Sequence, residues 1–486
     1  MKKTLTCLIL LLCAAALLLC SCTNGKKPPI ETDGGSGDAS DETLSGLPPM
    51  DFGEEGAPRE VVLLTFKGYN ADYHFFADDM EGNLLHQVAF ERTAYVNETY
   101  NVSLVAQEYN GTTCDPLFNS EAAGGGDYDF VYPHPDISWT NAIMQGCLTD
   151  FRTLEYVDLD AVYWNQSQIE EYTLGGKLFF AVSDFTMDGQ GFSAMIFNRK
   201  IATDLQFEKS LYDIVRDGEW TMEKMGQMLK LYGNDINEDK ANAQYGLVYE
   251  YGHTISLHIS AGLPLMGVDE SGNYYSELIN QTEKLNDMAQ KLYNLLWNSG
   301  DRVFINQSNY GTFSGSEGWT AFLSDRVLFM TYNIGSLYRY LQTYEGDMGF
   351  LPLPKFDELQ KDYYVSCGSG FLCIPAHAPD AQMSGFLLEA LAAYSYSYYR
   401  PTFFNNILLG RLSKVQEDYD MLDFLHAHKK YTIGLTFGGG GYQVLRGVVV
   451  DNKSTDTMSF VRNNYNMYMM SNTALNELKD FILNMK

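Results

Sequence analysis

The sequence has little positive charge and little cysteine. Its 486 residues include 33 lysines and arginines against 62 aspartates and glutamates, so the net charge is −29. A surface this acidic repels the phosphates of nucleic acids and anionic lipid head groups, which excludes nucleic acid as a class of partner. Only eight cysteines are present, and no Cys-x-x-Cys pair suggests a redox motif or a structural zinc site.

Signatures of several catalytic and nucleotide-binding classes are also missing. There is no G-x-S-x-G nucleophile elbow and no H-E-x-x-H zinc motif, and the glycines at 438–441 lack the Lys and Ser or Thr of a phosphate loop. Asp235, Asn237 and Asp239 resemble the start of a calcium loop, but Lys240 replaces the turn glycine. A solvated polar loop is the simpler interpretation, and we expect neither metal nor cofactor.

The first residues have the pattern of an export signal. Lys2 and Lys3 precede an uncharged apolar run from Leu5 to Leu19, which is too short for a comfortable membrane span of about 20 residues. The run ends in Leu-Cys-Ser-Cys, which resembles the lipobox of bacterial lipoproteins. That resemblance implies cleavage of residues 1–21 as a signal peptide and lipidation of Cys22. An ordinary secretory signal, or a short anchor helix, is the alternative.

Residues 22–59 are rich in Gly, Ser, Asp and Pro, a composition that favours a flexible tether. Beyond the signal and Cys22 the chain holds four cysteines, which allow three disulfide connectivities, and buried free thiols are an equal alternative. They are Cys114, Cys147, Cys367 and Cys373.

Strands and helices alternate after the tether, as in α/β proteins. The apolar run at 60–67 predicts a strand buried on both faces, and further strands are expected at 102–108 and 127–132. Helices are expected at 85–100, 222–232, 283–298, 319–324, 383–399 and 473–485.

Several segments, in order, resemble family 1 extracellular solute-binding proteins of ABC importers, which include the maltose-binding protein. No single motif is strong, and the order and rough spacing carry the resemblance over most of residues 60–400. The segments are ERTAYVNETYNVSL, GGGDYDFVYPHPDISWTNAIMQGCLTDF, YTLGGKLFFAVSD, MIFNRKIATD, GEWTMEKMGQMLK, AFLSDRVLFMTYNIG, MGFLPLPK and GSGFLCIPAHAPD.

The resemblance implies a two-lobed α/β fold of the periplasmic-binding-protein type (type II), with a hinge between lobes and the ligand between them. The first lobe is expected to hold residues 60–187 and 363–400. The second is expected to hold 188–362 and a C-terminal part, 401–486.

Sugars present an apolar ring face to aromatic side chains and hydroxyls to polar side chains, and α/β sheets bind ligands beyond their strands' carboxyl ends. Asp136 falls where the family's sugar binders place a hydroxyl-binding Asp, and Trp139 is expected to stack on a sugar ring. Asp136 as a helix cap, Trp139 as a helix-packing residue and Trp319 as a seal at a lobe edge are the alternatives. The expected ligand-binding residues are Tyr132, Asp136, Trp139, Trp319, Tyr332, Asn333, Ser369 and Gly370.

The function implied by the resemblance is that of a monomeric, lipid-anchored extracytoplasmic receptor. It binds a carbohydrate, an oligosaccharide, and delivers it to the permease subunits of an ABC importer without covalent chemistry. Two alternatives remain open: a surface enzyme that degrades glycans, and a ligand sensor for a membrane signalling partner. Peptides and polyamines also remain open as ligands, because one fold serves many ligands.

Overall fold

A computed structural model describes the chain from residue 44 onward, with gaps. Cys22, Ser369 and the calcium-like stretch 235–240 lie outside the described residues. The described residues are 44, 46–54, 56–69, 75–186, 192–233, 242–306, 316–335, 337, 344, 346–367, 370–406, 415–438 and 440–485.

The first lobe is built on a parallel three-stranded sheet of order β2-β1-β3. The central strand is β1 (Arg59–Phe66), flanked by β2 (Val102–Tyr109) and β3 (Phe130–Tyr132). Burial on both faces explains the uninterrupted apolar sequence of β1, since Leu63 and Leu64 point to opposite faces and both are fully buried. The return segment extends this lobe through isolated bridges, among them Val131 with Cys373.

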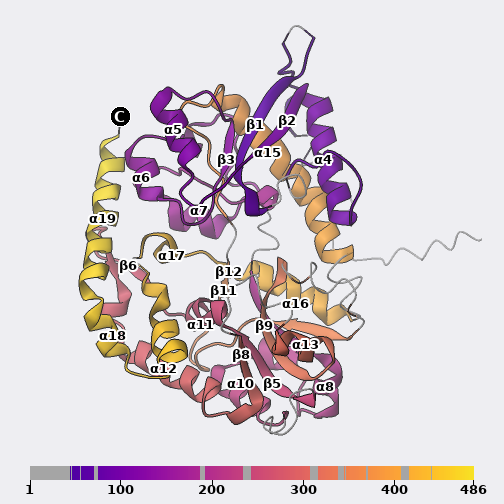
Figure 1. Ribbon diagram of the computed structural model, residues 1–486, viewed down its shortest axis with the longest axis vertical. Coiled ribbons are helices and arrows are strands. Elements are labelled where there is room, and N and C mark those ends of the chain that lie inside the picture. The colour runs from indigo at the N-terminus through magenta and orange to yellow at the C-terminus, as the bar shows by residue number, and fades with distance from the viewer. Residues whose placement is uncertain are drawn as a thin grey trace, which may run out of the picture. The chain divides into compact units, whose positions relative to one another are not determined.

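Helices cover the first sheet (Figure 1). The longest, α4 (Leu84–Tyr100), begins at Asn83, whose side-chain oxygen accepts from two backbone N–H groups, and ends at Asn101 in the left-handed conformation. The others are α5 (Asp115–Ala123), α6 (Trp139–Met144), α7 (Gln166–Tyr172) and α15 (Ala381–Tyr394).

The second lobe is built on a mixed five-stranded sheet of order β10-β4-β9-β5-β8. Strand β4 runs antiparallel to β10 and β9, whereas β5 runs parallel to both β9 and β8. The strands are β4 (Ser193–Asn198), β5 (Tyr245–Glu250), β8 (Val303–Asn306), β9 (Val327–Asn333) and β10 (Met348–Leu351).

The remaining elements surround this sheet or follow it in the chain. The helices are α8 (Arg199–Asp204), α9 (Leu211–Arg216), α10 (Met222–Leu229), α11 (Thr254–Ser260), α12 (Thr282–Leu296), α13 (Glu317–Leu323), α16 (Gln416–Ala427), α17 (Ile433–Phe437), α18 (Thr457–Asn463) and α19 (Tyr465–Asn484). Short strands are β6 (Met266–Val268), β7 (Tyr274–Ser276), β11 (Val365–Ser366) and β12 (Lys429–Lys430). Single helical turns are η1 (Lys67–Tyr69), η2 (Phe151–Thr153), η3 (Asp184–Thr186), η5 (Tyr251–His253), η6 (Glu277–Ile279), η7 (Gly300–Arg302), η8 (Ser395–Tyr399), η10 (Gly441–Gln443) and η11 (Arg446–Asp451).

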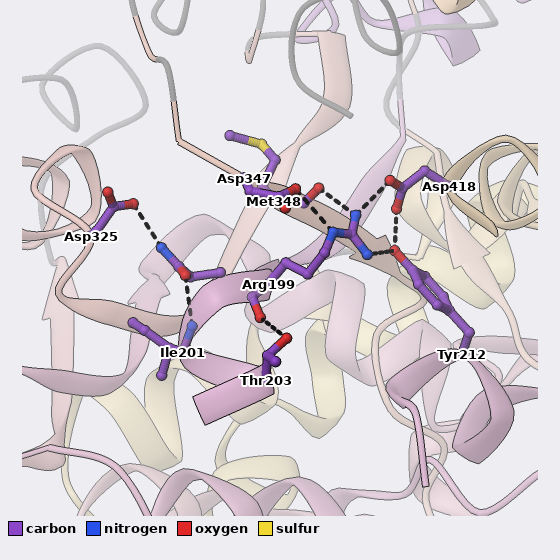
Figure 2. Close-up of polar contacts among 9 residues, drawn as sticks. Arg199, Ile201, Thr203, Tyr212, Asp325, Asp347, Met348 and Asp418 are labelled. Atoms are coloured by element: carbon purple, nitrogen blue, oxygen red, sulfur yellow. Dashed lines mark hydrogen bonds and ion pairs between the residues drawn. The ribbon is translucent and has the colours of Figure 1, made fainter. Parts of the chain in front are cut away.

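A buried polar network fastens α16 to the second sheet (Figure 2). The Arg199 guanidinium donates to the Asp347 carboxylate at 2.9 Å, to the Met348 carbonyl at 2.9 Å and to Asp418 Oδ2 at 2.6 Å. The Tyr212 hydroxyl donates to the other Asp418 oxygen and accepts from Arg199 at 3.1 Å. Since Asp418 is fully buried on α16, this network places α16 in the second lobe.

The rest of the C-terminal region lies on both lobes, which differs from the predicted assignment of 401–486 to the second lobe. The N–H of Ile433, the first residue of α17, donates to Glu171 of α7. In α19, Asn476 exchanges hydrogen bonds with Tyr274 of β7, and Ile482 lies against Gly175, where a Cβ would approach it to 2.9 Å. Long-range packing, invisible to local sequence patterns, decides this placement.

The expected elements are otherwise present: the strands as β1, β2 and β3, and the helices as α4, α10, α12, α13, α15 and α19. The two-lobed α/β fold is confirmed. All four cysteines beyond residue 43 are buried free thiols. No helix within the described ranges is long and apolar enough to cross a membrane.

The predicted tether, residues 22–59, does not extend to residue 59. The Phe52 ring packs against Phe386 at 5.6 Å, and its N–H donates to the Tyr100 carbonyl at 3.0 Å. Asp51 accepts from the Asn101 side chain at 2.9 Å. The Gly- and Pro-rich composition concealed these apolar anchors, so the chain joins the first lobe before β1 begins.

Candidate functional site

Polar side chains meet at the carboxyl edge of the second sheet. Strands β5, β8 and β9 run parallel, and Glu250 at the end of β5 is in register with Asn306 at the end of β8. The end of β9 brings Tyr332 and Asn333 to the same edge. Ligands of open α/β sheets bind at such an edge because several strand ends contribute side chains there.

Glu250 and His253 form the centre of this edge. Glu250 is 2% exposed, and its Oε2 lies 3.6 Å from His253 Nε2. Burial raises the pKa of Glu250 to about 7, against the opposing effect of the Gly252 N–H. Burial lowers the pKa of His253 to about 4, and its hydrogen bond to the Thr331 backbone opposes this. At neutral pH the imidazole is therefore uncharged, and the contact is not a true ion pair.

The Glu250 carboxyl group has unused hydrogen-bonding capacity. Among the described residues neither of its oxygens has a partner of ordinary hydrogen-bond geometry, although the Gly252 N–H acts on the carboxyl group, and His253 Nδ1 has no such partner either. A buried polar group left without hydrogen bonds costs about 1–3 kcal/mol, so a bound water or a ligand group that supplies the donor stabilises it. A hydroxyl group of a ligand would supply the missing donor.

Aromatic side chains back this polar pair. The Tyr332 ring lies 6.4 Å from the His253 ring and 5.5 Å from the Trp319 ring, measured between centroids. Trp319 is 4% exposed. It lies in the first turn of α13, which the Ser316 side chain caps. Trp319 therefore packs against Tyr332 as a buried residue. This resembles the alternative role, in which Trp319 seals a lobe edge. Asn333 is partly exposed beside it.

In the first lobe, the structure brings together the predicted residues Tyr132 and Gly370. The Gly370 N–H donates to the Tyr132 hydroxyl at 3.0 Å. A Cβ at Gly370 would lie 2.6 Å from that hydroxyl, so a larger residue there requires the Tyr132 side chain to shift. Thr65 of β1 donates to the Tyr132 carbonyl at 3.2 Å, which fixes the end of β3.

Asp136 lies on an exposed loop after β3. Its side chain is 71% exposed, and its Oδ2 lies 3.6 Å from His134 Nδ1. The helix cap that was the alternative role belongs to Ser138, whose hydroxyl accepts from the Asn141 N–H of α6. Asp136 is thus available to a ligand but held by few contacts.

Trp139 packs inside the first lobe instead of presenting a face for stacking. It is 3% exposed, with its ring 4.3 Å from Phe180 and 5.8 Å from Phe371. As the first residue of α6, its side chain turns onto the protein interior, in the helix-packing role that was the alternative. Ser369 lies outside the described residues.

Sequence reasoning missed Glu250 and His253. The signal was present, because Glu250 ends a buried strand, the same position that singled out Tyr132. Burial of the carboxyl group, which makes it notable, depends on β8 and β9 and was not visible in the sequence. Within the described part of the chain, no group of three or more metal-binding side chains occurs.

No family model and no curated protein matches the sequence. Solved structures show the same fold across nearly their whole length. The sugar-binding protein MalE from Xanthomonas citri is similar with a TM-score of 0.55 at 12% identity, covering 87% of this chain and 97% of that one.

Two further structures were determined with ligands. A cyclo/maltodextrin-binding protein complexed with maltotetraose is similar with a TM-score of 0.52 at 17% identity, covering 88% of this chain and 98% of that one. The ABC substrate-binding protein Lmo0181 from Listeria monocytogenes, in complex with cycloalternan, has a TM-score of 0.51 at 11% identity and covers 87% and 98%. At these identities the similarity establishes the fold.

Proposed function

We propose that the protein is an extracytoplasmic receptor that binds an oligosaccharide between its two lobes. It hands the ligand to the permease subunits of an ABC importer and performs no covalent chemistry. Lipid on Cys22 moors it to the membrane, and residues 23–43 connect the anchor to the folded body.

The observation that carries this proposal is the buried Glu250 carboxyl group at the carboxyl edge of the second sheet, whose oxygens lack partners of ordinary hydrogen-bond geometry among the described residues. A neutral, polyhydroxylated ligand suits it, since sugar hydroxyls donate to carboxyl oxygens and their ring faces pack on aromatic side chains. The fold shared with sugar-binding proteins along 97–98% of their length supports the same ligand class.

The proposed ligand groups come from both lobes. Tyr132 and Gly370 supply a fixed polar corner in the first lobe, and Asp136 supplies an exposed carboxylate next to it. The proposed ligand groups of the second lobe are Glu250, Tyr332 and Asn333. Closing of the lobes brings the two sets onto one ligand, a hinge motion typical of two-domain receptors.

Glu250→Gln tests the site. At pH 8, above the Glu250 pKa of about 7, we expect it to weaken oligosaccharide binding by about tenfold or more, because the carboxylate is the stronger acceptor and a hydrogen bond to a charged group contributes about 1.5–3 kcal/mol. Isothermal titration calorimetry with linear and cyclic glucose oligosaccharides measures the dissociation constant. Chromatography of the ligand after incubation shows whether it is intact, which separates a receptor from a glycan-degrading enzyme.

Glu389→Gln is the matched control. Glu389 is also 2% exposed and its pKa is also raised to about 7 by burial, but it accepts from Tyr163 and from Trp164 Nε1 inside the first lobe. We expect its affinity to equal that of the wild type. Equal affinities for all three proteins would remove Glu250 from the site, and no binding to any oligosaccharide would overturn the proposed ligand class.

A further inference from the structure

The C-terminal helix α19 is attached to both lobes. It runs without interruption from Tyr465 to Asn484 (Figure 1), and its sequence contains no glycine or proline. A helix of 20 residues is about 30 Å long, and without proline or glycine it has no site for a sharp kink. Two lobes that hold the same unkinked helix can rearrange freely only if one of them releases it.

Most of α19 is fastened to the second lobe. Tyr468 is fully buried and belongs to the hydrophobic core of that lobe. Asn476 exchanges two hydrogen bonds with the Tyr274 backbone of β7, at 2.8 and 2.9 Å. The Lys479 ammonium donates to the Gly272 carbonyl at 2.8 Å, in the turn between β6 and β7. Apolar burial and hydrogen bonds together therefore hold α19 on this lobe.

The last turn of α19 lies on the first lobe. Ile482 is 1% exposed and lies with Leu483 against the turn at Gly175, between α7 and η3, and α19 also packs against α6. A Cβ at Gly175 would lie 2.9 Å from Ile482 Cγ2 and 3.3 Å from Leu483 Cγ. The helix approaches this closely because glycine has no Cβ. Since the contact with the turn is apolar, the first-lobe end is the weaker of the two attachments.

We propose that α19 is a strap that holds the two lobes in one arrangement when no ligand is bound, and that its releasable end is the last turn on Gly175. Resting on the proposed receptor function, the strap keeps the ligand site between the lobes preformed. A preformed site binds more tightly, because the ligand does not have to order the lobes. Release of the last turn gives the lobes a wider range of arrangements and weakens binding.

The first measurement is the distance between the lobes without ligand. Spin labels carried by unnatural amino acids at the exposed positions Glu98 of α4 and Gln227 of α10 report it by pulsed electron paramagnetic resonance. We expect a narrow distribution of distances in the wild type. In Gly175→Ala we expect a broader distribution, because the added Cβ pushes Ile482 and the last turn of α19 away from the first lobe.

Gly176→Ala is the matched control. Both glycines have a positive φ, 55° at Gly175 and 82° at Gly176, so alanine strains the backbone at either position. A Cβ at Gly176 would meet no atom within 4 Å. We therefore expect Gly176→Ala to keep the wild-type distribution, which separates the contact with α19 from the strain of the turn.

Ile482→Ala tests the same contact from the helix. We expect a broader distribution and hydrogen exchange at least about tenfold faster in the last turn of α19, because a buried apolar contact is lost. Adding Gly175→Ala to Ile482→Ala should broaden the distribution little further, since the truncated side chain leaves room for the Cβ. Leu63→Ala removes a fully buried side chain from the first sheet and should keep the wild-type distribution despite its lower stability.

A broad distribution in the wild type would overturn the strap, as would equal broadening in Gly176→Ala. If Gly175→Ala fails to fold, Ile482→Ala decides, and unchanged distances and exchange in that variant overturn the strap. Titration calorimetry with the same oligosaccharides tests the preformed site: broadening without a rise in the dissociation constant would overturn it. If no oligosaccharide binds and the distances still depend on Ile482, the strap stands and the proposed ligand class fails.

Discussion

Replacing Arg199 with methionine should weaken the packing of α16 on the second lobe and destabilise the protein. The change keeps much of the aliphatic stem and removes the guanidinium that neutralises Asp418, which is fully buried (Figure 2). Of its described partners, Asp418 then retains the Tyr212 hydroxyl. Removing one member of a buried charged pair costs about 3–5 kcal/mol, because the other charge is left in the interior without compensation. We expect the free energy of unfolding to fall by about that amount.

Urea denaturation at pH 7 measures this loss, and hydrogen exchange of the α16 amides locates it. Arg216→Met is the control, because Arg216 is 46% exposed and contacts Asp213 at 3.2 Å and Asp420 at 3.7 Å on the surface. An exposed pair contributes at most about 1 kcal/mol. Adding Asp418→Asn to Arg199→Met should restore part of the stability by removing the uncompensated charge.

The reasoning is refuted if Arg199→Met costs no more than Arg216→Met. It is equally refuted if α16 keeps its wild-type protection against exchange in Arg199→Met. Either result would show that apolar packing, and not the polar network, holds α16 on the second sheet.

Two other consequences follow from buried side chains. Burial raises the pKa of Glu389 to about 7 from an ordinary 4.5, against its donors Tyr163 and Trp164, so the folded state binds its proton more tightly than the unfolded state does. The stabilising contribution of Glu389 is fully present below about pH 4.5 and is lost as the pH rises through about 7. Glu389→Gln should therefore change the slope of the free energy of unfolding against pH in that window. Urea unfolding at pH 5 and 7.5 measures this slope, and parallel profiles for the two proteins would contradict the prediction. Trp139→Ala should lower the free energy of unfolding by about 3–5 kcal/mol through the cavity left against Phe180 and Phe371, with oligosaccharide affinity retained at temperatures where the variant is folded. Calorimetry measures both the stability and the oligosaccharide affinity of this variant. Lost affinity with little lost stability would return Trp139 to the ligand site.

The elements of the fold were accessible from the sequence because they follow local patterns. The unbroken apolar run of β1 indicates burial on both faces, and the length and periodicity of α12 indicate a helix packed on one side. The order of weak family-like segments predicted two lobes. In such a fold the chain leaves the first lobe and returns to it after a fixed order of elements. The extent of the tether was misjudged, since Phe52 is a single apolar anchor within polar sequence.

The candidate site was accessible only in part. The rule that ligands bind beyond strand ends selected Tyr132, Tyr332 and Asn333, which do lie at strand ends, and the structure brings Gly370, also predicted from the sequence, into contact with Tyr132. It did not distinguish a side chain that faces the ligand from one that faces the interior, so Trp139 was expected to stack on a sugar although it fills the first lobe.

The sequence by itself determined the acidic surface, the export-like start and the order of strands and helices, because these depend on composition and on neighbours within a few residues. Tertiary structure alone decided that the buried Glu250 carboxyl group has unused hydrogen-bonding capacity and that Arg199 reaches Asp418. Arg199 and Asp418 are distant in the chain. Burial and electrostatic environment arise only when such segments meet, so no local pattern records them.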